Sequence, residues 1–215
     1  MTNQIATTRS NDHESQPATI VLATANAGKI AELRHLLEPA WRVRGMNEFN
    51  VVAAEETGTT FEENAILKAE AIRNQTGLVC LADDSGLEVD ALNGEPGVYS
   101  ARYAGPDAND AANRQKLLQA MNDKGADNRS CRFVGVLALA IPGRDTIIVR
   151  GECEGTVGFE ERGTNGFGYD SLFVFHDGRT MAELEPAEKD QVSHRARAMQ
   201  QLLRVLPDVL AAEVP

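Results

Sequence analysis

Apolar positions near the start of the chain follow two patterns in succession. Residues 18–24, ATIVLAT, form a short β-branched run that predicts a buried strand. The segment KIAELRHLLEP that follows has helical spacing, and Pro39 ends it because proline has no N–H to donate. One face of this predicted helix carries Ile30, Leu33, Leu36 and Leu37. The chain therefore begins its ordered part with a strand followed by a helix.

A second helix and strand are predicted from residue 60 onward. Thr60 and Glu63 form a capping-box pattern, which starts a helix that runs to about Asn74. LVCLA, residues 78–82, then predicts a buried strand that ends in a turn at Asp83–Gly86. Leu87, Val89 and Ala91 alternate as a further strand does.

The second half of the chain contains more strands than helices. Residues 107–122 predict a helix whose buried side carries Leu117, Leu118 and Met121. Residues 131–141 and 146–155 predict two long strands joined by a turn at 142–145, and residues 171–175 predict another strand. A last helix from about Ser193 carries Ala196, Met199, Leu203 and Leu206. Strands that alternate with helices early and follow one another later indicate an α/β or α+β fold around a mixed sheet.

Length and composition narrow the class of protein. At 215 residues with 42% hydrophobic and 25% charged positions, the chain is typical of a folded globular protein. Residues 1–17 are polar and lack periodicity, so we expect a disordered tail there and a single domain over 18–215. The net charge of −11 disfavours binding to a nucleic acid polymer. No apolar run is long enough for a membrane span, and we expect a cytoplasmic protein.

Cysteine and histidine spacing gives no metal or disulfide pattern. The three cysteines lie far apart, with no C-x-x-C pair, and the four histidines show no ligand spacing. A disulfide framework and a zinc knuckle are therefore not expected.

The first candidate site lies between the first strand and the first helix. Residues Thr24–Lys29, TANAGK, place a lysine at a helix N-terminus, where backbone N–H groups attract anions. The pattern is neither a Walker A loop nor a dinucleotide-binding turn. It predicts a phosphate cradle, and the alternative is an ordinary strand-to-helix turn with an exposed lysine.

Lys68 is the second candidate because of its position on the second helix. At 100° per residue from Phe61, Lys68 falls at about −20°, in the middle of the apolar stripe. An ammonium there either extends to the rim of the helix or meets a buried anion.

The third candidate is the acidic pair Asp83 and Asp84, which is followed by Ser85 and Gly86. Ligands bind at the carboxyl ends of strands in open sheets, and adjacent carboxylates repel unless a cation or a proton intervenes. Hard oxygen ligands favour Mg²⁺ over zinc. Glu55 and Glu56 are a further source of carboxylate, although exposed acidic pairs are usually only solvated.

Two further candidates lie in the last quarter of the chain. The segment GTNGFGYD, residues 163–170, combines three glycines with Phe167 and Tyr169, whose rings offer faces for a flat ligand. Lys189 and the run Ser193–Arg195 place three donor side chains close together in sequence. The alternatives are a flexible loop with aromatic anchors and a capped helix start with solvated charges.

Taken together, these segments resemble the inosine triphosphate pyrophosphatase family, also called non-canonical purine NTP pyrophosphatases or XTP/dITP diphosphatases. The resemblance covers residues 19 to about 205. It is carried by TANAGK, EETGTTFEENAILKA, ADDSGLEVDALNGEPGVYSARYAG, GTNGFGYD and EKDQVSHR. Ser171 departs from the family, in which proline often follows FGYD, and the first 17 residues are additional.

The resemblance implies a fold, an activity and a set of roles. It implies an elongated mixed β-sheet flanked by helices, with the nucleotide site in a cleft between two lobes. It implies a homodimeric, Mg²⁺-dependent enzyme that cleaves ITP, dITP and XTP to the monophosphate and pyrophosphate. The residues expected to contact substrate are Thr24, Ala25, Asn26, Ala27, Gly28, Lys29, Lys68, Ser85, Phe167, Gly168, Tyr169, Asp170, Lys189, His194 and Arg195.

The implied catalytic residues are Asp84, Asp83 and Lys68, with Glu56 and Asp84 as the metal ligands. Asp84 is the expected base, and the sequence leaves Asp83 open as an alternative. Two other functions also remain open: a pyrophosphatase for modified pyrimidine or methylated nucleotides, and a nucleotide-binding module without turnover.

Overall fold

The structure, a computed structural model, describes residues 18–38, 41–125 and 127–211, with side chains up to residue 206. The predicted tail and Pro39 lie outside these ranges. One six-stranded sheet has the order β2-β1-β3-β4-β5-β6. The strands are β1 Thr19–Leu22, β2 Arg42–Gly45, β3 Val79–Val89, β4 Ser130–Ala140, β5 Ile147–Val157 and β6 Phe173–Val174. Strands β2, β1 and β3 are parallel, and each pair from β3 to β6 is antiparallel, so the predicted mixed sheet is confirmed.

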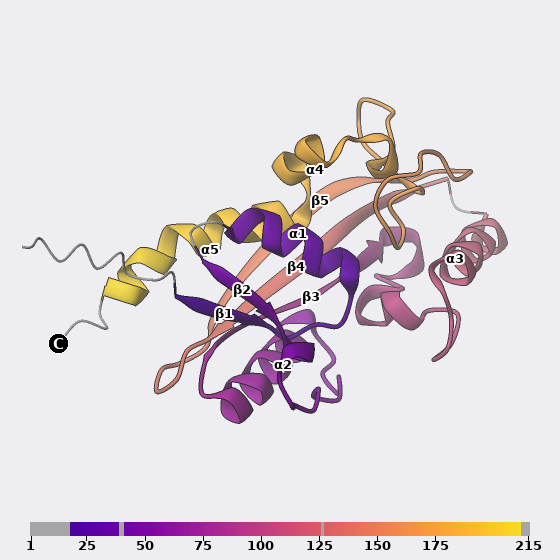
Figure 1. The fold of residues 1–215 in the computed structure, drawn as a ribbon. Helices are drawn as coiled ribbons and strands as arrows, with labels where there is room; N and C mark the ends of the chain where they lie inside the picture. Colours follow the sequence, from indigo (N-terminus) through magenta and orange to yellow (C-terminus); the bar gives the residue numbers. More distant parts are fainter. Residues whose placement is uncertain (1–17, 39–40, 126, 212–215) are drawn as a thin grey trace, which may run out of the picture.

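Helices cover both faces of this sheet (Figure 1). They are α1 Ala27–Leu37, α2 Phe61–Thr76, α3 Asp110–Lys124, α4 Pro186–Val192 and α5 His194–Ala211. Helices α1 and α5 lie on one face and α2 on the other, while α3 packs near the far ends of β3 and β4. Within the described residues, none of the helices combines the length and the apolarity that a membrane span requires.

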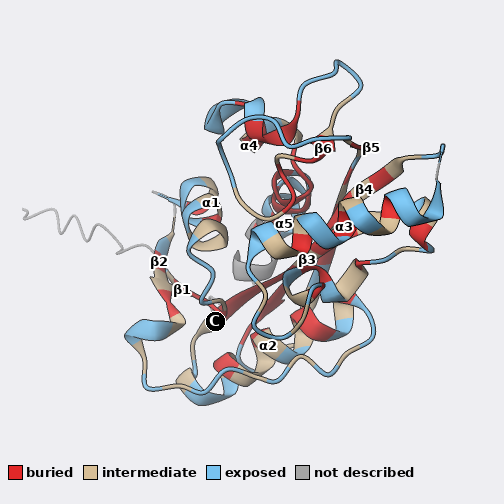
Figure 2. Ribbon diagram, turned by 90° about the vertical axis from the view of Figure 1, so that its right-hand side faces the viewer, coloured by how far each residue is buried: buried red, intermediate tan, exposed pale blue. Residues whose placement is uncertain are grey.

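The sheet has a wide end and a narrow end. Strand β1 pairs with β3 only at Val79–Leu81, whereas β3 pairs with β4 from Cys80 to Val89. Among the described residues, the edge of β3 therefore has no neighbouring strand beyond Leu22. Figure 2 shows the buried residues concentrated in the sheet and on the inner sides of the helices. Separate apolar clusters pack against the two ends of the sheet, around Leu81 and around Phe173.

Helix starts follow the predicted capping chemistry. The Thr60 hydroxyl accepts from the Glu63 N–H at 3.1 Å, and the Glu63 carboxylate accepts from the Thr60 N–H at 3.2 Å. The Ser193 hydroxyl accepts from the Ala196 N–H at 3.1 Å, which confirms that Ser193 caps the last helix.

The turn predicted at Asp83–Gly86 is wrong. These four residues lie in the middle of β3 and pair in register with Gly135 and its neighbours on β4. The glycine is needed for close packing: a Cβ on Gly86 would lie 2.4 Å from the Gly97 carbonyl oxygen. A long-range strand partner has overridden local turn propensity here.

Smaller differences concern the C-terminal half. Helix α3 begins at Asp110, three residues later than predicted, and α4 was not predicted. The strand predicted over residues 171–175 is reduced to the two residues of β6. On α5, Leu203 is exposed, while Leu202 packs in the core together with Ala196, Met199 and Leu206.

Two glycines allow α5 to lie directly on the sheet. Gly135 and Gly151 are partners on β4 and β5, and Ser85 on β3 pairs with Gly135. A Cβ on Gly151 would lie 2.2 Å from the His194 carbonyl oxygen, and one on Gly135 would lie 2.8 Å from the His194 ring. The two glycines therefore bring the first turn of α5 against the centres of β4 and β5, and from there the Arg195 side chain reaches Asp83 and Ser85 on β3.

Candidate active site

The N-terminus of α1 lies beside the open edge of β3. The Asn26 side chain caps this helix by accepting from the Lys29 N–H at 3.1 Å. The first N–H groups of a helix have no partner inside it, so they are available to an anion. The Lys29 ammonium contacts Asp83 Oδ1 at 2.5 Å, and its side chain is 15% exposed. The predicted cradle thus has the geometry of an anion site, with its lysine paired to a carboxylate.

Asp83 and Asp84 face opposite sides of the sheet, because successive side chains of a strand alternate. Asp83 meets Lys29 and Arg195 on the α1 and α5 side. Asp84 meets Lys68 on the α2 side. The two carboxylates therefore do not form the single cluster that adjacency in sequence suggests.

On the α2 side, Lys68 holds two carboxylates together. Its ammonium donates to Asp84 Oδ1 at 2.6 Å, to Glu56 Oε1 at 2.9 Å and to the Asp83 carbonyl oxygen at 2.9 Å. Arg102 donates to the other oxygen of Glu56 at 3.0 Å. The lysine in the apolar stripe of the helix therefore meets a buried anion, Asp84, which is one of the two predicted outcomes.

Burial and charge shift the acidity of these groups in different directions. Burial raises the pKa of Asp84 above its ordinary value, although the Lys68 charge opposes this. Burial alone would raise the pKa of Glu56, but Lys68 and Arg102 together lower it. Burial alone would also lower the pKa of Lys68, and the charges of Asp84 and Glu56 reverse that effect. Asp84 is thus a carboxylate with increased proton affinity next to a cation.

On the α5 side, Arg195 is buried among acidic partners. Its Nε donates to Asp83 Oδ2 at 2.9 Å, and its Nη2 donates to the Ser85 hydroxyl at 3.1 Å. Its third contact is with Glu32 of α1. Burial opposes ionisation of Asp83, yet Arg195 and Lys29 hold the pKa of that carboxyl far below its usual range. Asp83 is therefore charged at neutral pH.

Lys189 of α4 completes a second cationic position on this side. Its ammonium lies 2.6 Å from Asp170 Oδ2 and 2.8 Å from Glu32 Oε1. Asp170 also accepts from the Phe167 N–H at 2.9 Å, which fixes the loop that carries the aromatic ring. Glu32 thus links α1 to both Lys189 and Arg195.

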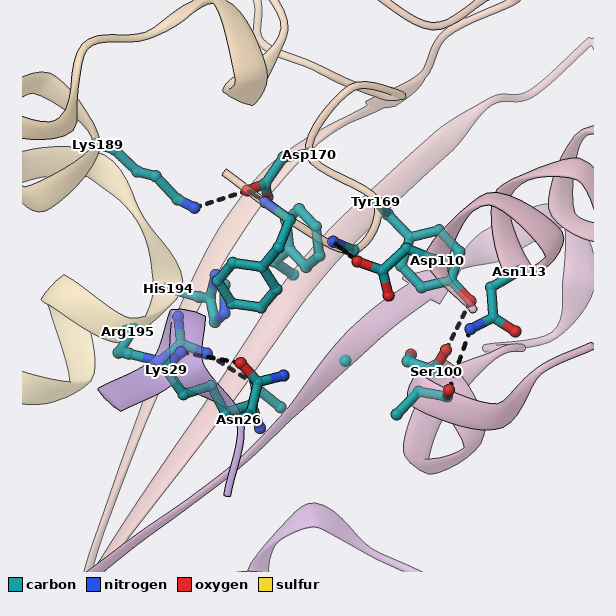
Figure 3. Close-up of a pocket in the computed structure, with 16 residues that line it drawn as sticks. Asn26, Lys29, Ser100, Asp110, Asn113, Tyr169, Asp170, Lys189, His194 and Arg195 are labelled. Carbon is teal, nitrogen blue, oxygen red and sulfur yellow. Dashed lines mark hydrogen bonds and ion pairs between the residues drawn. The ribbon is translucent and has the colours of Figure 1, made fainter. Parts of the chain in front are cut away.

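A pocket of about 620 Å³, including space open to solvent, lies between α1, the 163–170 loop and the start of α5 (Figure 3). It is lined by Asn26, Lys29, Ser85, Gly86, Ser100, Ala101, Asp110, Asn113, Phe133, Phe167, Gly168, Tyr169, Asp170, Lys189, His194 and Arg195. Phe167 is partly exposed, and its ring lies 5.0 Å from the Lys189 ammonium. A Cβ on Gly28 would lie 2.6 Å from that ring, so α1 and Phe167 are in close contact.

Tyr169 differs from Phe167 in its surroundings. Tyr169 is 4% exposed, and its hydroxyl donates to the Ser100 carbonyl oxygen at 2.8 Å. Helix α3 holds the loop between the two rings, because Asp110 accepts from the Gly168 N–H at 2.7 Å and Arg114 donates to the Gly168 carbonyl at 2.8 Å. Phe167 is therefore the ring available for stacking, and Tyr169 anchors the loop. Downstream, the Ser171 hydroxyl donates to Glu161 at 3.2 Å.

His194 lies at the base of the pocket. Its ring stacks on Phe133 with centroids 4.9 Å apart, and its Nδ1 has no hydrogen-bond partner among the described residues. Burial, reinforced by the Arg195 charge, holds the pKa of His194 well below its ordinary value. The ring is therefore neutral at pH 7.

The structure brings the predicted residues together in two groups. The pocket group contains Asn26, Lys29, Ser85, Phe167, Gly168, Tyr169, Asp170, Lys189, His194 and Arg195. Glu56, Lys68 and Asp84 form the second group, on the other face of β3. Thr24 supports the first, because its hydroxyl accepts from the Asn26 N–H at 3.1 Å. Ala25 and Ala27 are exposed beside this turn.

Sequence analysis missed Glu32, Arg102, Asp110 and Arg114. Glu32 lies one helical turn after Lys29, so helical spacing alone places it on the same side of α1. Arg102 has no comparable signal in the sequence, since it reaches Glu56 from 46 residues away.

The donor set on the α2 side fits a hard divalent cation. Glu56 and Asp84 both contact the Lys68 ammonium, so their oxygens already converge on one position of positive charge. No group of three or more histidine, cysteine, aspartate or glutamate side chains arranged for a metal occurs in the described part of the chain. These residues therefore suit an ion that shares its coordination with a ligand or with water, as Mg²⁺ does.

Comparison with known proteins places this arrangement in a family. Residues 20–205 match the Ham1 family. The chain belongs to the Ham1 family.

Relatives and solved structures of Ham1 proteins match most of the chain. The dITP/XTP pyrophosphatase of Bacillus licheniformis is 49% identical over 190 residues, which cover 87% of this chain and 97% of that protein. The dITP/XTP pyrophosphatase of Haemophilus influenzae is 50% identical over 184 residues, 84% of this chain and 94% of that one. The structure of a HAM1 protein from Coxiella burnetii superimposes with a TM-score of 0.82 at 46% identity, covering 89% and 99% of the two chains.

Proposed function

We propose that this protein is a nucleoside triphosphate pyrophosphatase that hydrolyses dITP, ITP and XTP to the monophosphate and pyrophosphate. The observation that carries the proposal is the placement of two groups of site residues on opposite faces of β3. A pocket with an aromatic ring lies on one face, and the partly buried group of Asp84, Lys68 and Glu56 lies on the other. The two relatives are named dITP/XTP pyrophosphatases, and that activity supports the proposal.

In this proposal the pocket binds the purine and the sugar of the substrate. Phe167 offers a partly exposed face for stacking, while Lys189, Arg195 and His194 lie around it. The triphosphate extends from there toward the N-terminus of α1 and Lys29, and then across the open edge of β3 to Lys68. About four negative charges on the substrate are balanced locally, although the whole chain carries −11.

Asp84 is the general base in this proposal. Its carboxylate accepts a proton from water as the water oxygen bonds to the α-phosphorus. The bond from that phosphorus to the bridging oxygen breaks, and its electron pair leaves with pyrophosphate. The raised pKa of Asp84 suits it to hold the proton during this step. Glu56 and Asp84 are the proposed ligands of Mg²⁺, which supplies charge neutralisation for the phosphates when bound.

Asp83 fits an anchoring role better than a basic one. Three donors already occupy its oxygens, those of Lys29, Arg195 and Ser85. Its depressed pKa makes it a poor proton acceptor. We therefore assign it the task of fixing the two cations that line the pocket.

Selectivity follows from the chemistry at C6 of the purine. Hypoxanthine and xanthine present a carbonyl acceptor there, and adenine presents an amino donor. Lys189 and Arg195 are permanent donors in this pocket, so adenine would place donor against donor. Unpaired buried polar groups cost about 1 to 3 kcal/mol each, and together they give strong discrimination.

Initial rates with ITP, dITP, XTP, GTP and ATP test the proposal when pyrophosphate and orthophosphate are both measured. We expect pyrophosphate as the product, and kcat/KM for ITP, dITP and XTP at least about 100-fold above that for ATP. Equal rates for ATP and ITP would contradict the proposed selectivity of the pocket for a carbonyl at C6. Faster turnover of modified pyrimidine or methylated nucleotides would support the related pyrophosphatases, and binding without turnover would support a sensor module.

The remaining expectations concern assembly, cation and location. We propose a cytoplasmic homodimer over residues 18–215 that requires Mg²⁺ and has no nucleic acid polymer or membrane as partner. Sedimentation equilibrium at micromolar protein tests the assembly, and a mass equal to one chain would contradict it. Full turnover in excess EDTA would contradict the cation requirement.

A further inference from the structure

Arg102 is the most exposed cation among those paired with carboxylates around the two groups of site residues. Its side chain is 32% exposed, compared with 15% for Lys29, 13% for Lys68, 9% for Lys189 and 2% for Arg195. The others are held by two or more acidic or carbonyl partners, apart from Lys29. In the described part of the chain Arg102 has one carboxylate partner, Glu56, and it lies over the Tyr99 ring at 5.3 Å. Because its side chain is the most exposed of these cations, water can solvate the guanidinium when it leaves Glu56.

Glu56 shares its two oxygens between two cations. Oε1 accepts from Lys68 and Oε2 from Arg102. A divalent cation that binds Glu56 must therefore compete with one of them. Lys68 keeps Asp84 and the Asp83 carbonyl when it loses Glu56, but Arg102 keeps no carboxylate. A released guanidinium at this place has strong preference for a phosphate, which matches its fork of donors.

Hydrogen bonds to α3 and to the 163–170 loop hold the backbone around Arg102. Asn113 donates to the Ala101 carbonyl at 3.1 Å and accepts from the Ala104 N–H at 2.8 Å. The Tyr169 hydroxyl binds the Ser100 carbonyl of the same 3-10 helix, Gly97–Arg102. The Arg102 side chain thus extends from a backbone segment that is also hydrogen-bonded to the loop that carries the aromatic rings.

We propose that Arg102 binds substrate phosphate: it pairs with Glu56 in the free protein and transfers to the triphosphate when Glu56 takes up a divalent cation. The proposal rests on the proposed function for the identity of its ligand. Arg102 is then one of the residues that contact the phosphates. The Glu56–Arg102 ion pair exists in the free protein and breaks when a cation binds Glu56.

Binding of inorganic tripolyphosphate tests the contact without a base and without turnover. Calorimetric titration with Mn²⁺ present should show Arg102→Met weakened about 10- to 100-fold, because a charged hydrogen bond is lost. Arg102→Lys should fall between it and the parent. Arg132→Met is the matched control, since Arg132 is 31% exposed and paired with Glu88 of β3 and with Asp90 just after that strand. Melting curves of each variant confirm folding.

A second titration, in EDTA, tests the transfer. Glu56→Gln releases Arg102 without any cation, so its affinity for tripolyphosphate should exceed that of the parent. The double variant Glu56→Gln/Arg102→Met should lose this gain, which separates Arg102 from Lys68. This arm still decides the matter if Arg102→Met alone folds poorly, because Glu56→Gln/Arg102→Lys should then retain part of the gain.

Binding of Mn²⁺ to the nucleotide-free protein gives the opposite sign. Removing Arg102 removes a competitor for Glu56, so Arg102→Met should bind Mn²⁺ about two- to fivefold more tightly. If Arg102 only orients Glu56, Arg102→Met should bind Mn²⁺ more weakly and bind tripolyphosphate within twofold of the parent. That result would overturn the proposal. Failure of the parent to hydrolyse ITP would contradict the proposed function instead, since none of these titrations depends on turnover.

Discussion

Asp83 and Asp84 are neighbours in sequence, yet each forms its ion pairs on a different face of β3. Asp83 pairs with Lys29 and Arg195, and Asp84 pairs with Lys68. Burial raises the pKa of Asp84, while two cations depress the pKa of Asp83. Relative to the same groups in water, the folded protein thus makes Asp84 easier to protonate and Asp83 harder to protonate. This difference separates a candidate base from a structural anion.

Replacing either aspartate by asparagine should therefore give contrasting results. Asp84→Asn should fold with a melting temperature near that of the parent, because its site tolerates a neutral group. Its kcat should fall about 10²- to 10⁴-fold through loss of the base. Steady-state kinetics with ITP and thermal melts measure both effects. Turnover within about threefold of the parent in a folded Asp84→Asn protein would exclude Asp84 as the base.

Asp83→Asn is the matched comparison on the opposite face. The Asp83 side chain has no exposed surface, and its removal leaves Arg195 and Lys29 short of a partner. Loss of one member of a buried ion pair costs about 3 to 5 kcal/mol of unfolding free energy. Urea denaturation at pH 7 measures this loss, and a stable, inactive Asp83→Asn protein would instead support Asp83 as the base.

Lys68→Met should lower stability as well as turnover. The substitution leaves Asp84 buried without its cation, although Arg102 still binds Glu56. We expect a loss of about 3 kcal/mol at pH 7. The loss should shrink as the pH falls, since protonation of Asp84 removes the unpaired charge. Denaturation at pH 7 and pH 5 measures it. A loss that is the same at both pH values would show that packing, rather than charge, is responsible.

The position of Lys68 was predicted from local sequence, whereas the path of the Asp83–Gly86 segment was not. Helical geometry is local, so the position of Lys68 in the apolar stripe of α2 already required a buried anion or an exposed rim. The path of β3 depends on ten partner residues of β4, about 50 positions away, and no local pattern in an aspartate-rich segment reports such pairing.

Glu32 and Arg102 show the same contrast, between local and long-range determinants, within the site. The turn of α1 after Lys29 predicts that Glu32 lies near it, but its partners Lys189 and Arg195 come from the other end of the chain. Arg102 contacts Glu56 only because the 3-10 helix at Gly97–Arg102 packs on β3 through Gly86. Such contacts follow from the fold, and the sequence motif alone does not indicate them.

Gly28→Ala should weaken nucleotide binding without weakening the fold. The added Cβ would lie 2.6 Å from the Phe167 ring, so the ring must move. Alanine favours a helix over glycine by about 1 kcal/mol, which keeps α1 stable. Displaced stacking should raise KM for ITP about tenfold. The double variant Gly28→Ala/Phe167→Ala serves as the control: if Gly28→Ala still raises KM in the Phe167→Ala background, contact with the ring is not the cause.

His194 should make the protein less stable as the pH falls below about 6.5. Burial, reinforced by Arg195, lowers the folded-state pKa of His194, so the unfolded chain binds the proton more tightly. The contribution of neutral His194 is complete above the unfolded pKa and declines as the pH drops toward the folded one. Its limiting slope is about 1.4 kcal/mol per pH unit. Asp83 contributes its own acid loss only below about pH 4, because its folded pKa is depressed.

Urea denaturation of the parent and of His194→Phe between pH 7.5 and 5 isolates this contribution. Phenylalanine keeps the stacking on Phe133 and cannot take a proton. The difference in unfolding free energy between the two proteins should shift in favour of His194→Phe as the pH falls, whatever its value at pH 7.5. His176→Gln is the control, because His176 is exposed. Parallel pH curves for the parent and His194→Phe would mean that His194 binds protons equally in the folded and unfolded states, which would contradict a lowered pKa of His194 in the fold.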